Sequence, residues 1–110
     1  MKKIVLLLSI FVSLQLSAQT KKTIDTKIFV NGICGMCEDR IENVLDVKGI
    51  KLANWDEDSK MCRIVYRQDL ISEEKIHQIL ADAGHDTKKV KATKEAYENL
   101  HHCCHYKREN

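Results

Sequence analysis

The sequence predicts an α+β domain whose strands and helices follow the order β-α-β-β-α-β, with an additional helix at the C-terminal end. Three observations support this prediction. The apolar residues of positions 24–91 switch repeatedly between the two-residue period of a strand and the 3.6-residue period of a helix. Turn-forming residues separate these segments. The 110 residues of the chain are enough for one small domain with a tail.

The first half of the domain is expected to hold one strand and one helix. Residues 24–30 alternate, and their apolar side chains share one parity: Ile24, Ile28 and Val30. After the turn signal Asn31-Gly32, apolar residues recur at a spacing of three to four: Ile41, Val44, Leu45 and, less regularly, Val47. Acidic residues near its start suit the first turn of a helix, where the helix dipole stabilises them. We therefore expect a strand over 24–30 and a helix that begins at Cys37 and ends at Lys48-Gly49.

The middle of the chain predicts a β-hairpin followed by a second helix. Residues 50–55 and 61–67 flank a polar turn at 56–59. The apolar parity changes within 50–55, which a β-bulge would reconcile. In the following strand Cys62, Ile64 and Tyr66 share one face, so Cys62 is expected in the core. Ser72 is a good helix cap and Gly84 a natural stop, with His77 expected on the helix surface.

The last segments complete the expected fold. Residues 86–91 form a short, charged run that suits an edge strand. The resulting order is that of a ferredoxin-like βαββαβ sandwich. Residues 94–104 place apolar residues and cysteines on one helical face, so a C-terminal helix is expected there: Ala96, Tyr97, Leu100, Cys103 and Cys104. We expect a domain over 19–92 and a Cys/His-rich tail over 93–110.

Residues 1–18 have the form of a secretory signal peptide. Lys2 and Lys3 precede an apolar run, Ile4–Leu16, and small residues at Ser17-Ala18 follow it. The run is too short to span a bilayer comfortably. We therefore expect a periplasmic or secreted protein that has no membrane segment after removal of the signal.

The charge of the expected mature chain is balanced. Of the 18 basic residues, Lys2 and Lys3 leave with the signal, and the remaining 16 equal the 16 acidic residues. The charges are interspersed, and no basic stripe indicates a nucleic-acid partner.

All five cysteines lie beyond the signal: Cys34, Cys37, Cys62, Cys103 and Cys104. In an oxidising compartment the simplest interpretation is disulfide bonds. The odd number and the clustered spacing argue against disulfides as the whole explanation.

The Cys34-x-x-Cys37 pair has the chemistry of a soft-metal site. Cys37 would lie in the first turn of a helix, where the dipole and free N–H groups stabilise a thiolate. Cys34 would lie in the loop just before it, and Gly32 and Gly35 would let that loop fold tightly. Two thiolates in an open loop suit a soft cation such as Cu(I) or Hg(II).

The stretch Val30–Cys37, with Ile41, Leu45, Gly49-Ile50 and Ala83-Gly84, resembles the heavy-metal-associated domain family. That family includes copper chaperones, domains of copper-pumping ATPases and periplasmic mercury-binding proteins. Its usual loop is Gly-Met-x-Cys-x-x-Cys, whereas here Met36 lies between the two thiols. The resemblance implies a protein that binds metal through Cys34 and Cys37. No catalytic nucleophile–base pair with an orienting acid is apparent in the sequence, so an enzyme is not expected. The resemblance also implies a metal-transport protein or a metal-dependent target as partner, reached by thiolate exchange.

The tail adds a second group of ligand residues. If residues 94–104 form a helix that docks on the helix-free face of the sheet, Cys103 and Cys104 arrive near Cys34 and Cys37. The hypothesis is a shared site with up to four sulfurs, able to hold Zn(II) or Cu(I). Weaker candidate ligands are His85, His102 and His105. For these histidines a solvent-exposed loop position or an incidental place in a frayed terminus is the alternative.

The favoured function is therefore an exported soft-metal-binding protein, a copper chaperone or scavenger with Cu(I) preferred. A thiol–disulfide oxidoreductase or redox sensor that uses the C-x-x-C pair is the main alternative. The absence of proline from the chain argues against a thioredoxin fold, which needs a cis-proline facing its cysteines. A disulfide-closed adaptor with a vestigial metal motif is a third alternative.

Overall fold

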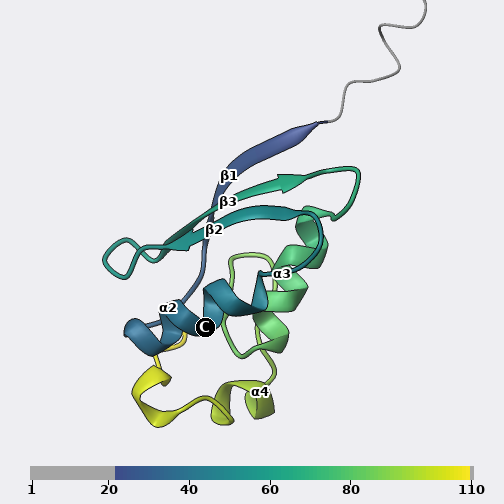
Figure 1. Cartoon of the computed structure of the whole chain (residues 1–110). Helices are drawn as coiled ribbons and strands as arrows, with labels where there is room; N and C mark the ends of the chain where they lie inside the picture. The colour runs from purple at the N-terminus through teal and green to yellow at the C-terminus, as the bar shows by residue number, and fades with distance from the viewer. Residues whose placement is uncertain (1–21, 110) are drawn as a thin grey trace, which may run out of the picture.

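The computed structural model describes residues 22–109, so the expected signal peptide lies outside the described residues. In chain order the protein forms β1 (Thr23–Phe29), α2 (Gly35–Val44), β2 (Ile50–Trp55), β3 (Met61–Arg67), α3 (Glu73–Asp82), α4 (Lys94–Glu98) and the short 3₁₀-helix η2 (His102–Cys104) (Figure 1). No helix within the described range is long and apolar enough to cross a membrane.

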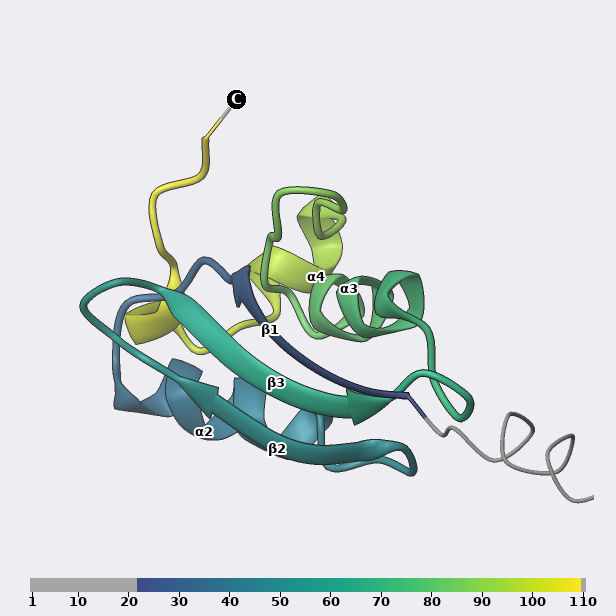
Figure 2. The same cartoon turned by 90° about the horizontal axis from the view of Figure 1, so that it is seen from above.

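The three strands form an antiparallel sheet in the order β1-β3-β2, and α2 and α3 lie on one side of it (Figures 1 and 2). The strand boundaries predicted from alternation agree with the structure to within one residue. The register shifts between Ile50 and Leu52, which confirms the expected bulge in β2. The predicted β-α-β-β-α order is confirmed in this part of the chain.

The core lies between the sheet and the helices and contains the side chains that periodicity assigned to it. Its fully buried aliphatic members come from both layers: Val30, Ile41, Leu45, Ile64, Ile76 and Leu80. Burial of each such side chain stabilises the fold by about 1.5–3 kcal/mol. Cys62 is also fully buried, as predicted, and burial raises the pKa of its thiol to about 12.

The helix boundaries follow their predicted signals at three of four ends. Ser72 caps α3 by accepting a hydrogen bond from the backbone N–H of Lys75 at 3.1 Å. Gly84, just beyond α3, has φ +103°, a conformation that favours glycine. The first helix begins around the C-x-x-C pair but ends at Val44, before the predicted stop, because the chain turns at Leu45–Gly49.

The predicted edge strand at 86–91 is wrong. Only one isolated antiparallel bridge, between Val30 and Thr87, stands where that strand would pair. Side chains satisfy the backbone here instead of a sheet ladder: Asp86 Oδ1 accepts from the N–H of Ala92 at 2.7 Å, and Thr87 Oγ1 accepts from that of Val90 at 3.1 Å. These bonds curl the segment into a loop.

The predicted route of the tail is also wrong. The tail contains two short helices, α4 and η2, and lies beyond α2 and α3, on the side of the helices and not on the open sheet face (Figure 1). On the open face Asp25 and Arg63 form an ion pair at 2.7 Å. Leu100 is buried against Gly84 instead, where any added Cβ would meet it at 2.9 Å.

His77 is buried, contrary to the expected surface position. Its ring Nδ1 lies 2.6 Å from Thr87 Oγ1, so the helix and the 86–92 loop share a polar contact. His85 is fully buried as well. Burial lowers the pKa of both imidazoles below the ordinary 6.5, so both are neutral in the folded protein near pH 7.

These histidines predict a loss of stability in mild acid. As the pH falls below about 6.5, these two histidines become protonated in the unfolded chain but stay neutral in the folded chain, because their pKa is lower there. The free energy of unfolding should fall by up to about 1.4 kcal/mol for each histidine and each pH unit over that window. Urea unfolding followed by circular dichroism between about pH 7.5 and pH 5.5 measures it, with the exposed-histidine variant His101→Asn as a control of unchanged slope. A flat profile in the wild type would contradict the prediction.

Candidate metal centre

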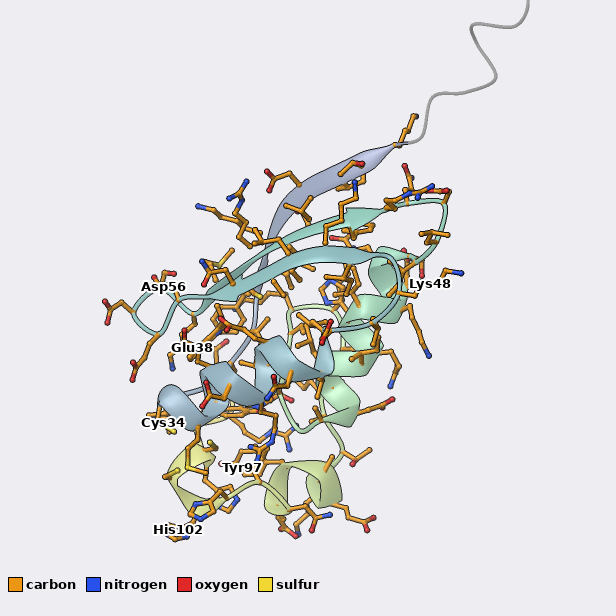
Figure 3. All side chains as sticks on the ribbon, in the orientation of Figure 1. Cys34, Glu38, Lys48, Asp56, Tyr97 and His102 are labelled. Atoms are coloured by element: carbon orange, nitrogen blue, oxygen red, sulfur yellow. The ribbon has the colours of Figure 1, made fainter. Side chains whose placement is uncertain are left out.

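The first two sulfurs are placed by the junction of β1 and α2. Cys34 is the N-cap residue of α2 and Cys37 lies in its first turn, as predicted (Figure 3). Their sulfur atoms lie 3.8 Å apart, and the backbone N–H of Ile33 points at Cys37 Sγ, 3.5 Å away. Cys34 is half-buried and Cys37 is fully buried.

The loop that carries these cysteines is supported from β2. Trp55, at the end of β2, donates from its indole N–H to the carbonyl of Val30 at 2.9 Å. A Cβ on Gly32 would lie 3.0 Å from the Trp55 ring and 3.1 Å from Cys37 Cβ. Glycine is therefore needed at this close approach, and the Trp55 indole positions the loop by contacting both Val30 and Gly32.

The tail brings two more cysteines to the same place. Cys104 Sγ lies 3.5 Å from Cys34 Sγ, and Cys103 Sγ lies 3.6 Å from it. The predicted proximity of the two cysteine pairs is thus confirmed, although the tail arrives by another path. The sulfurs of Cys34, Cys37 and Cys104 all lie within 4.8 Å of one another, and we call these three residues the inner set.

The spacing of the inner set fits metal coordination. With metal–sulfur bonds of ~2.3 Å, the sulfurs of a tetrahedral or trigonal site lie about 3.8–4.0 Å apart. The separations of 3.5 Å and 3.8 Å need only small adjustments to reach that range. All five cysteines are free thiols here, and a disulfide would require sulfurs about 2.05 Å apart.

The thiols of Cys34 and Cys104 differ in acidity. Partial burial alone would raise the pKa of Cys34, but hydrogen bonds from the backbone of Cys37 and Met36 and from the thiols of Cys104 and Cys103 lower it to about 7. Burial raises the pKa of Cys104, and the neighbouring Cys37 and Cys34 raise it further. Cys34 therefore supplies a thiolate near neutral pH, whereas Cys104 does not.

Tyr106 anchors the tail beside the site, a role that sequence patterns did not indicate. Its hydroxyl donates to the carbonyl of Gly84 at 2.7 Å and accepts from the backbone N–H of Asp86 at 2.9 Å. The side chain is 1% exposed. Two residues further on, Arg108 pairs with Asp86 at 2.8 Å. The available signals in the sequence were an aromatic residue two positions after Cys104 and a cation four positions after it.

The histidines expected as weaker ligands lie outside the inner set. The His85 ring Nδ1 lies 2.9 Å from the backbone oxygen of Asn31, so His85 supports the loop that leads to Cys34. His102 stacks on His101 and His105 packs against Tyr97, with ring centroids 4.8 Å and 5.0 Å apart, and both are exposed. Within residues 22–109, the group of ligand atoms that includes the inner set contains no histidine.

No protein-family model matches this chain, and a search of curated proteins finds no significant match. Solved structures do match. A CopZ metallochaperone is 20% identical with a TM-score of 0.56, covering 58% of this chain and 98% of that one. A copper-binding domain from HMA7, a P-type ATPase, is 26% identical with a TM-score of 0.56, covering 58% and 89%. The water-soluble region of the P-type ATPase CopA from Bacillus subtilis is 20% identical with a TM-score of 0.58, covering 63% and 47%.

These similarities show that the chain has the fold of heavy-metal-associated, copper-binding domains, as the sequence resemblance implied. In this chain the fold carries a cluster of three thiols, one from the N-cap of α2, one from the first turn of α2 and one from the tail.

Proposed function

We propose that this protein binds a soft metal ion, with Cu(I) preferred, and passes it to another protein by thiolate exchange. One observation carries the proposal: three sulfurs from sequence positions 70 residues apart converge within 4.8 Å on one side of the domain. Such convergence needs the tail to be held in place, and Tyr106 and Arg108 hold it.

The ligand chemistry favours Cu(I) over harder or higher-coordinate ions. The inner set supplies three thiolate ligands, which soft cations of low coordination number prefer. Zn(II) would require a fourth ligand to complete its tetrahedron. Hg(II) shares the preference for sulfur and is the main competitor. The similarity to the copper-binding domain from HMA7 supports the same choice.

Transfer would start at the exposed side of the cluster. Cys34 is half-buried, whereas Cys37 and Cys104 are buried, so an incoming thiolate reaches the metal from the side of Cys34. The incoming sulfur bonds to the metal before one of the three resident sulfurs leaves, which keeps the ion coordinated throughout. The partner is then a metal-transport protein or a metal-dependent target. The signal-like residues 1–18 favour a periplasmic or extracellular place for this exchange.

Competition binding with matched cysteine variants tests the proposal. The reduced protein is mixed with Cu(I), Zn(II) and Hg(II) and examined by native mass spectrometry. Cys104→Ala should lower Cu(I) affinity by more than about 10-fold. The removal of a metal ligand should lower affinity at least as much as the removal of a residue that only hydrogen-bonds a ligand. Cys62→Ala is the matched control, since Cys62 is equally buried but faces the core, and its Cu(I) affinity should not change.

The same samples separate the alternative function. Cys34, with its pKa of about 7, also has the reactivity of a redox thiolate. Insulin reduction by the wild type at a rate that Cys34→Ala abolishes, together with no retained Cu(I), would favour an oxidoreductase and overturn the metal proposal.

A further inference from the structure

Two sulfurs next to the inner set are not part of it. Cys103 Sγ lies 3.6 Å from Cys34 Sγ, and Met36 Sδ lies 3.4 Å from Cys103 Sγ. Cys103 is exposed, and it is absent from the group whose atoms all lie within 4.8 Å. The tail cysteines therefore point to two adjoining places, Cys104 to the buried side of Cys34 and Cys103 to its exposed side.

Met36 is the least expected member of this arrangement. It lies on the first turn of α2 and is 45% exposed, so burial in the core does not explain it. Its thioether contacts the Cys103 thiol at 3.4 Å, so it lies beside the tail. A thioether is a soft ligand of the kind that Cu(I) accepts.

We infer that Cys34, Cys103 and Met36 form an outer subsite for a second Cu(I) ion, bridged to the first ion by the sulfur of Cys34. The inference rests on the proposed function, since the bridge requires an ion in the inner set. The outer separations of 3.4 Å and 3.6 Å resemble those of the inner set, and the same small adjustment brings them to coordination spacing.

Charge favours a second ion. One Cu(I) in the inner set leaves three thiolates around one positive charge, a net charge of about −2 in a partly buried place. A second Cu(I) adds one positive charge and only one further thiolate, that of Cys103, while Met36 contributes a neutral sulfur. The net charge stays near −2 but is spread over two ions and five sulfurs. Each of the four thiols releases its proton to solvent when its sulfur binds metal.

The alternative is that Cys103 completes a four-sulfur site for one ion. Cys103 would then have to approach Cys37 and Cys104 as closely as it approaches Cys34, and it does not belong to that group. It instead contacts Met36, which a single four-thiolate site would not use. The geometry therefore favours two adjoining three-sulfur subsites.

The subsites would differ in exchange rate. Cys37 and Cys104 are fully buried, whereas Cys103 and Met36 are exposed. The outer ion should leave first to a competing thiol or chelator, and the inner ion should follow more slowly. This order would make the outer subsite the place where a partner first meets the metal.

Titration of the reduced, full-length chain with Cu(I) under native mass spectrometry tests the inference. The wild-type monomer should take two ions, Cys103→Ala one, and Met36→Leu should bind the second ion at least about 10-fold more weakly. Met61→Leu is the matched control, because Met61 lies on β3 and is not among the residues whose sulfurs contact Cys34 or Cys103, so this variant should keep two ions. X-ray absorption at the copper edge should show a metal–metal vector in the wild type that Cys103→Ala lacks.

The outcomes separate the two proposals. A wild-type monomer that binds one Cu(I), with the same affinity in Cys103→Ala, overturns the outer subsite and leaves the proposed function standing. A second ion that appears only in a dimer, or that Met36→Leu and Cys103→Ala both retain at full affinity, also overturns it. A wild type that binds no Cu(I) removes both proposals together.

Discussion

Replacing Cys34 by serine should abolish tight binding of both Cu(I) ions, a larger loss than any other single substitution causes. Cys34 contacts three other sulfurs, at 3.8 Å, 3.6 Å and 3.5 Å, and no other cysteine is shared between the inner and outer subsites. Mutation of a residue that only hydrogen-bonds a metal ligand already lowers metal affinity by about 10–100-fold. The loss of a ligand that bridges two ions should therefore lower Cu(I) affinity by more than about 100-fold. Competition against a Cu(I) chelator of known affinity measures it.

Two further variants show whether the loss belongs to the bridge. Cys37→Ser removes an inner ligand alone and should leave weak binding of a single ion. Cys103→Ser removes an outer ligand alone and should leave one tightly bound ion. Cys34→Ser should keep nearly the wild-type unfolding midpoint in the absence of metal, because Cys34 is only half-buried where it packs against the core and serine is close to it in size. If Cys34→Ser still binds one ion tightly, the bridging role is wrong.

Local patterns were sufficient to predict most of the fold. The alternation of 61–67 and the stripe of α3 each depend on side chains that face one core, so periodicity identifies them. Ser72 is recognisable because its cap uses residues only three positions apart. The change of apolar parity within β2 predicted the bulge, because it too is visible within a few neighbouring residues. Each of these features is decided within a few neighbouring residues.

The errors arose where distant residues decide the structure. Residues 86–91 have the composition of an edge strand, but Asp86 pairs with Arg108 and receives the N–H of Ala92. Arg108 lies 22 positions after Asp86, and no residue within 86–91 indicates that this ion pair forms. The predicted route of the tail was wrong because its length permits either side of the domain, whereas a contact between distant residues, that of Leu100 with Gly84, holds it beside the helices.

The candidate site was predicted through its cysteines but not through its supports. Cys34 and Cys37 follow from a short motif, and the richness of the tail in Cys and His indicated Cys103 and Cys104. The contact of Met36 with Cys103 links residues 67 positions apart, and sequence spacing carries no information about it. Tyr106 was missed for the same reason, since its partners lie 20 and 22 residues earlier.

Replacing Tyr106 by alanine should both destabilise the protein and weaken Cu(I) binding, although every metal ligand is kept. Removal of a buried aromatic side chain costs about 3–5 kcal/mol, and its hydroxyl bonds to Gly84 and Asp86 are lost with it. The tail is then no longer held in place before the metal binds. Metal binding must therefore also order the tail, and the conformational entropy lost in doing so weakens Cu(I) affinity. Affinity should fall by at least about 10-fold, and urea unfolding of the metal-free protein should shift to lower midpoints.

Tyr106→Phe separates the two contributions of the anchor. It keeps the ring beside His85, with centroids 6.0 Å apart in the wild type, and removes the hydroxyl alone. The expected loss is about 1–3 kcal/mol of stability, because the buried N–H of Asp86 loses its acceptor.

Added Cu(I) should raise the unfolding midpoint of Tyr106→Ala, since the ion binds only the conformation in which the tail is docked. Wild-type affinity in Tyr106→Ala, measured under conditions where that variant is folded, would mean that the sulfurs converge without the anchor, and that the metal itself holds the tail.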